Sequence, residues 1–126
     1  MSISLTIDDL EIIWMTLLWC LEVPFTNSKK EEIVCGPQVK RLMNDAEEKY
    51  LSEREKRRSP QWKNEPCHKQ IVLQYKDPDT ISLIHKCLQS VSEEIGHSET
   101  EVELVLGKYE DFVKLRDYFA DVVREN

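Results

Sequence analysis

Four aspartates stand where short alternating segments give way to helical periodicity, and acids in such places can bind a metal ion. Asp8 and Asp9 follow one alternating segment, and Asp77 and Asp79 follow another. Carboxylate oxygens suit a hard cation such as Mg²⁺, and ligands often bind at the carboxyl ends of parallel strands. Acids at these positions also cap helices and complement the positive end of the helix dipole. We favour capping; a metal-dependent enzyme at the acidic turns is the second alternative.

Two cysteines and two histidines have the chemistry of a zinc site or of a thiol nucleophile with its base. Cys67 adjoins His68, and His85 precedes Cys87 by two positions. Neighbouring residues of an extended segment point to opposite sides, and Cys87 falls on the apolar face of its predicted helix. We therefore expect a buried thiol there rather than a ligand.

Motifs that would support an enzyme are missing from the sequence. There is no C-x-x-C pair among the four cysteines and no glycine-rich phosphate loop, since the only glycines are at 36, 96 and 107. The sequence thus predicts no catalytic residue, no metal and no cofactor, and it argues against a small-molecule ligand. A non-enzymatic protein is the expectation.

A basic segment is the basis of the first alternative, a nucleic-acid-binding accessory protein. Residues 37–76 hold ten Lys or Arg against six acids, although the whole chain has a formal charge of -7. Lys and Arg bind phosphates, and an aromatic ring can stack on a base. Neighbouring acids dilute this segment, and pairs such as Glu53 with Arg57 would make it an ordinary solvated helix end. The nucleic-acid candidates are Arg54, Lys56, Arg57, Arg58, Trp62 and Lys63.

Two further surfaces favour binding to another protein. The run IIWMTLLWCL at 12–21 makes the first predicted helix apolar nearly all round, so it must be covered on more than one side. Acidic side chains form a second surface, which could engage a basic groove on a partner. They lie in residues 99–103 and in the last helix, at Asp117, Asp121 and Glu125. The candidate partner-binding residues are Trp14, Met15, Leu18, Trp19, Glu101 and Glu103.

The leading hypothesis is a small cytoplasmic adaptor, regulator or inhibitor that docks on a larger macromolecule. Its partner is another protein, for instance one with a basic groove that holds nucleic acid, and self-association as a homodimer is a further expectation. The apolar run is too short to cross a bilayer of roughly 30 Å, and acids rather than basic residues precede it. Scattered cysteines without an export signal indicate reduced thiols.

The candidate site residues must be positioned by the strands and helices around them. Three hexapeptides that alternate apolar and polar residues are the predicted strands. Residues 2–7, 70–75 and 101–106 each offer one apolar and one mostly polar face, as in a sheet with one wet face. Each is followed by apolar residues at helical spacing. The first helical stripe holds Leu10, Ile13, Trp14, Leu17 and Leu21, the next Ile81, Ile84, Leu88, Val91 and Ile95, and the last Tyr109, Phe112, Val113, Phe119, Ala120 and Val123.

A further helix between the first two units carries Val39, Leu42, Met43, Ala46 and Tyr50 on one face. The predicted fold is therefore α+β, a two-layer sandwich of β-α-α-β-α-β-α order, whose three-stranded sheet has helices mainly on one face. We expect one domain over residues 1–126, loops at 24–37 and 59–69, and a projecting, mobile segment at 53–66. The place of the first strand in the sheet is left open.

Overall fold

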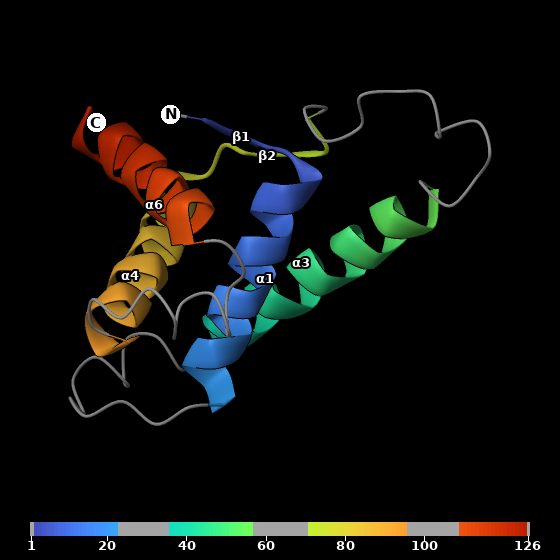
Figure 1. Cartoon of the computed structure of the whole chain (residues 1–126), viewed down its shortest axis with the longest axis horizontal. Helices are drawn as coiled ribbons and strands as arrows, with labels where there is room; N and C mark the ends of the chain where they lie inside the picture. The colour runs from blue at the N-terminus through green and yellow to red at the C-terminus, as the bar shows by residue number, and fades with distance from the viewer. Residues whose placement is uncertain (1, 23–35, 57–70, 96–108, 126) are drawn as a thin grey trace.

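The computed structural model of the chain describes residues 2–22, 36–56, 71–95 and 109–125. In chain order the elements are β1 (Ile3–Leu5), α1 (Ile7–Glu22), α3 (Pro37–Lys56), β2 (Leu73–Tyr75), α4 (Pro78–Ile95) and α6 (Tyr109–Arg124), as Figure 1 shows. Helices hold 83% of the described residues. The framework is accordingly a group of helices with a short two-stranded ribbon along one end (Figure 1).

The two strands pair antiparallel, which settles the position of β1. Ile3 lies opposite Tyr75, and Leu5 lies opposite Leu73. Ile3 and Leu5 are fully buried beneath the ribbon, while the side-chain amide of Gln74 donates to the Ser4 hydroxyl at 2.9 Å on its outer face. Within the described strands, the predicted alternation of a buried and a wet face is confirmed.

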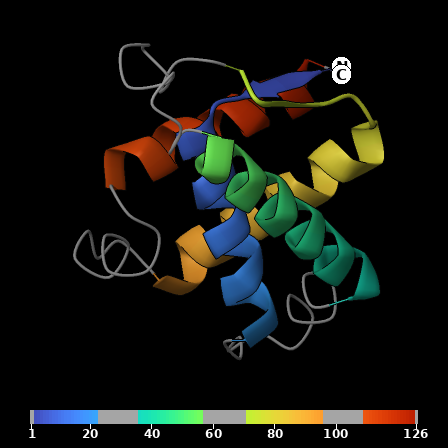
Figure 2. The ribbon, with the colours of Figure 1, turned by 90° about the vertical axis from the view of Figure 1, so that its right-hand side faces the viewer.

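α1 is the central helix. It packs against α3 on one side and against α4 and α6 on the other (Figures 1 and 2). Helical spacing places Leu10, Ile13 and Leu17 on its most buried face, and all three are 0% exposed. Burying a side chain of this size contributes about 1.5–3 kcal/mol, so α1 supplies a large share of the core. From α4 and α6 the core receives Ile81, Ile84, Cys87, Leu88, Val91, Phe112, Leu115 and Phe119.

The predicted α+β sandwich is wrong. In place of a three-stranded sheet with helices mainly on one face, the described residues form four helices and a two-stranded antiparallel sheet. The β-α-α-β-α-β-α order fails with it, because the described elements include no third strand. Residues 101–106, predicted as that strand, lie outside the described residues.

The physical reason lies in α1. A helix that is apolar nearly all round buries most surface when other helices surround it, and a sheet can cover only one of its sides. Three helices do so here, and the strands are reduced to a ribbon at their end (Figure 2). Period-2 alternation over six residues indicated extended backbone but overstated its length, because Ile7 is already the first residue of α1.

The helix bounds agree with the predicted stripes. The four core positions predicted in the first four turns of α4, from Ile81 to Val91, are all fully buried. α3 begins at Pro37, a residue whose fixed φ suits the first helical position. Among the described helices, none combines the length and the apolar character that crossing a membrane requires.

Candidate functional site

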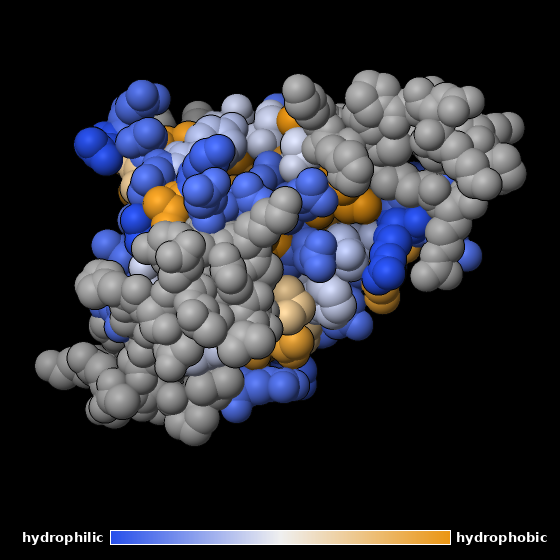
Figure 3. All heavy atoms as spheres, in the orientation of Figure 1, coloured by the Kyte–Doolittle hydropathy of each residue, from blue (hydrophilic) through white to orange (hydrophobic). Residues whose placement is uncertain are grey.

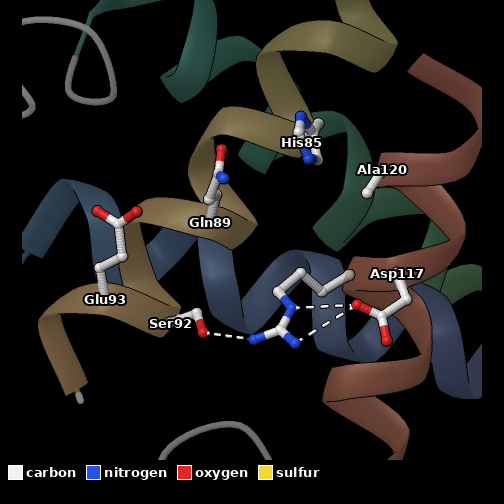
Figure 4. A pocket seen from close by; sticks show the side chains of 7 residues that line it. His85, Gln89, Ser92, Glu93, Asp117 and Ala120 are labelled. Carbon is white, nitrogen blue, oxygen red and sulfur yellow. Dashed lines mark hydrogen bonds and ion pairs between the residues drawn. The ribbon is translucent and has the colours of Figure 1, made fainter. Parts of the chain in front are cut away.

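A groove between α4 and α6 contains a cluster of titratable side chains. Its volume is about 450 Å³. Figure 4 shows the wall from α4 facing the wall from α6 across it. Both helices turn their apolar faces to the core. The residues that border the groove come from their outward faces and are mostly hydrophilic. The lining residues are His85, Gln89, Ser92 and Glu93 from α4, and Arg116, Asp117 and Ala120 from α6.

Arg116 connects the two walls of this groove. Its Nη1 donates to the hydroxyl of Ser92 on α4 at 2.7 Å. Its Nε and Nη2 both donate to one oxygen, Oδ1, of the neighbouring Asp117, each at 3.4 Å. The short bond to Ser92 fixes the guanidinium, whereas the two long contacts to a single oxygen are weaker than a bidentate ion pair. The side chain is 31% exposed, so solvent reaches it from the groove.

His85 stands at the α4 wall of the same groove (Figure 4). Partial burial lowers the pKa of this imidazole below its ordinary value of 6.5, since burial penalises the charged form. The ring is therefore mainly neutral at pH 7, and it adds no positive charge to the groove.

The α6 side of the groove continues as an acidic ridge formed by Asp117, Asp121 and Glu125. The Asp117 side chain is 61% exposed, and that of Asp121, one turn further along, is 65% exposed. Arg124 contacts Asp121 at 3.2 Å but is itself 76% exposed, so water screens this pair strongly. All three acids were predicted as part of an acidic face, and the structure places them on the outer side of α6.

The acidic turns serve as helix caps. Thr6 and Asp9 form a capping box: the Asp9 N–H donates to Thr6 Oγ1 at 3.3 Å, and Asp9 Oδ2 accepts from the Thr6 N–H at 3.1 Å. Asp77 accepts from the Asp79 N–H and from the Thr80 hydroxyl at 3.3 and 2.8 Å. The two turns line separate hollows. The described residues thus favour capping over a shared cation.

The Cys/His set is not brought together in the described part of the chain. Cys87 is fully buried, as predicted, and its carbonyl accepts from the Cys20 thiol at 4.0 Å. His85, two residues earlier on α4, lies in the groove instead. Cys67 and His68 lie outside the described residues. Over the described ranges, His, Cys, Asp and Glu make no group of three or more that could hold a metal.

Part of the basic segment forms the last turn of α3, so the predicted projecting stretch at 53–66 begins inside a helix. Glu53 there contacts Lys49 at 3.2 Å and Lys56 at 3.3 Å. Such ion pairs are typical of an ordinary solvated helix end, which is the alternative to nucleic-acid binding for this segment. Arg54 is exposed on the same turn. The other candidates, Arg57, Arg58, Trp62 and Lys63, lie outside the described residues.

The apolar partner-binding candidates of α1 lie half-buried within the fold. Met15 and Trp19 pack against the main core. Trp14 lies on a second, smaller core, with its ring centroid 5.4 Å from that of Tyr50 on α3. Leu18 is also half-buried. Binding of a partner or a second copy through this helix stays a prediction, and Glu101 and Glu103 lie outside the described residues.

Two buried polar atoms accept or donate no hydrogen bond within the described residues: the Nε1 of Trp14 and the hydroxyl of Tyr75. Burial, and then the nearby Asp45 carboxylate, raises the pKa of Tyr75 to about 12. Burial also raises the pKa of Tyr50, with a further contribution from Glu11. Both phenols are therefore neutral at physiological pH.

Four groove residues were not predicted from the sequence: Gln89, Ser92, Glu93 and Arg116. A usable signal was present, because Gln89 and Ser92 lie on the polar side of α4, opposite its apolar stripe. Which helix that polar side would face was not encoded in the local pattern. Comparison of the chain with protein-family models, with curated proteins and with solved structures found no match.

Proposed function

We propose that the chain is a non-enzymatic protein-protein interaction module, a small cytoplasmic adaptor, regulator or inhibitor that docks on a basic surface of a larger macromolecule. The observation that carries the proposal is the exposed acidic ridge on α6. Asp117 and Asp121 present side chains that are 61% and 65% exposed on successive turns. Carboxylates arranged in this way attract a basic partner and set its register.

The character of the remaining surface supports docking through charge. On the face seen in Figure 3, the described atoms are mostly hydrophilic, and apolar ones form only small separate patches. Large exposed apolar side chains are few in the described residues: Leu51 on α3, Ile71 before β2 and Tyr118 on α6. A formal charge of -7 adds long-range attraction to a basic partner. Apolar contact is a less suitable basis for docking at this surface.

The cytoplasmic part of the proposal rests on the thiols. Cys20 and Cys87 are both buried within the core, as reduced cysteines of a cytoplasmic protein commonly are. The nucleic-acid alternative gains no support from the described part of α3, because Glu53 there contacts Lys56, one of its candidate residues, as well as Lys49.

A comparative capture experiment tests the proposal. The bait is the whole chain immobilised in wild-type form, as the double variant Asp117→Asn/Asp121→Asn, and as the control Asp45→Asn/Glu48→Asn, which removes two exposed carboxylates from α3 instead. We expect the same protein to be captured by the wild type and the control and to be lost with the α6 variant. Capture that is equal with all three baits, or a nucleic acid in place of a protein, would contradict the proposal.

A further inference from the structure

We infer that the groove between α4 and α6 receives a basic side chain, an arginine or a lysine, of the docked partner. This inference rests on the proposed function. It names the group of the partner that enters the groove beside the acidic ridge.

Size and lining are the first argument. A hollow of about 450 Å³ lies within the range of ligand sites, roughly 300–1,000 Å³. Its lining side chains are polar or charged except for Ala120. The aliphatic parts of these side chains and Ala120 also contribute to the lining, so the groove presents both apolar and polar surface. The groove therefore suits a long polar side chain whose methylene stem can lie along Ala120.

Charge is the second argument. Among the groove residues, Arg116 contributes +1, and Glu93 and Asp117 contribute -1 each, so with a neutral His85 the formal sum is -1. The guanidinium of Arg116 already donates to both Ser92 and Asp117. Its charge is thus partly offset by Asp117, and an incoming acid would meet a groove whose formal charge is negative. A cation fits the balance better.

The position of Asp117 is the third argument. Its Oδ1 accepts the two long contacts from Arg116, and no hydrogen bond within the described residues uses its Oδ2. A carboxylate accepts several hydrogen bonds, so Oδ2 can take one from an ammonium or a guanidinium. Figure 4 shows Asp117 at the α6 side of the groove, opposite the side chains of α4. Ser92 acts as a positioning residue, because it holds the guanidinium that in turn contacts Asp117.

Titration of the isotope-labelled chain with a hexa-arginine peptide, followed by NMR, tests the inference. We expect amide shifts to concentrate at His85, Gln89 and Ala120. Asp117→Asn should weaken binding about fivefold, the loss that an exposed ion pair accounts for. Gln89→Lys, which places a cation in the groove from the exposed side of α4, should weaken it similarly. The control Glu48→Gln on α3 should bind like the wild type.

Three outcomes would overturn the inference. Shifts spread evenly over all acidic positions would indicate non-specific attraction. Equal weakening by Glu48→Gln would indicate the same. Saturable binding of a hexa-glutamate peptide to the groove residues, with none of hexa-arginine, would identify an acidic partner group instead.

The two proposals fail separately. If the protein captured by the wild type is lost with the α6 variant but hexa-arginine leaves the groove amides unshifted, the groove assignment is wrong and the docking function stands. If hexa-arginine binds in the groove while capture is unaffected by the α6 variant, the docking function is wrong and a cation-binding groove remains.

Discussion

The hydroxyl oxygen of Tyr118 accepts a hydrogen bond from the backbone N–H of Ser4 at 3.2 Å, joining α6 to β1 across 114 positions of sequence. Ser4 lies between Ile3 and Leu5, the two buried residues of β1. Its N–H is thereby satisfied by a helix on the far side of the sequence. The ribbon is thus held on one side by strand pairing and on the other by a helix.

Replacing Tyr118 with Phe removes the acceptor and leaves the ring in place. We expect a loss of about 0.5–1 kcal/mol in the free energy of unfolding, the usual net value of one hydrogen bond. Hydrogen exchange should accelerate at the Ser4 amide and change much less at Ile3 and Leu5, which serve as internal controls. An unaltered exchange rate at Ser4 would show that this bond does not hold the strand.

The wild type should lose stability at alkaline pH as Tyr75 ionises, and Tyr75→Phe should abolish that loss. The folded-state pKa is about 12, against 10.0 for the ordinary phenol. The unfolded state therefore releases its proton first, so the stability contribution of the neutral phenol is full below pH 10 and is lost as the pH rises towards 12. Denaturant unfolding at pH 8 to 11.5 should show a steeper decline in the wild type than in Tyr75→Phe.

The same variant should be tolerated at pH 7. The Tyr75 hydroxyl is buried and has no hydrogen-bond partner in the described residues, so deleting it abolishes no bond and removes a desolvation cost. Stability equal to the wild type or up to about 1 kcal/mol higher is expected. A loss of 2 kcal/mol or so would mean that the hydroxyl is bonded in solution.

His85 should make the fold less stable in mild acid. Because burial lowers its pKa below 6.5, the unfolded state takes up a proton first as the pH falls. The contribution of the neutral ring is full above pH 6.5 and is lost as the pH falls through the folded-state pKa. Glu93, Arg116 and Asp117 line the same groove and would meet the added charge.

Thermal unfolding from pH 8 to pH 5 checks this dependence. His85→Gln keeps a polar side chain without a proton to gain, and its melting temperature should fall less than that of the wild type over the same range. Parallel curves for the two proteins would assign the acid sensitivity to other groups.

Asp77 and Asp79 offer a matched test of capping against metal binding. Asp77→Ala should cost about 1 kcal/mol, because its carboxylate accepts from the Asp79 N–H and the Thr80 hydroxyl. Asp79→Ala removes an exposed acid from the first turn of α4 and should cost less than Asp77→Ala. Melting temperatures with and without Mg²⁺ should coincide for the wild type. A rise with Mg²⁺ that Asp77→Ala abolishes would revive the metal site.

How far the fold follows from local pattern can be seen in α4 and in the ribbon. The 3.6-residue periodicity of Ile81, Ile84, Leu88 and Val91 predicted a helix with its buried face, and all four are fully buried. For the strands, alternation identified the extended segments but not their length or partners. Pairing of β1 with β2 joins residues about 70 positions apart, and such pairing depends on what else covers the apolar face.

The candidate site was less predictable than the core. The acidic character of Asp117 and Asp121 was evident from the last helix alone, and the burial of Cys87 from the periodicity of α4. The contact of Arg116 with Ser92 joins the outward faces of two helices. A polar residue on such a face carries no local signal for which neighbour it will meet.

The sequence by itself determined where the helices lie, which stripe of each is buried, and the acidic character of the surface. All of these follow from the spacing of apolar and charged residues along one element. Only the tertiary structure decided that three helices rather than a sheet surround α1, and that α4 and α6 lie side by side and so form the groove at Arg116. Packing of a helix that is apolar nearly all round has several local solutions, and the best one depends on the total surface that all the elements bury together.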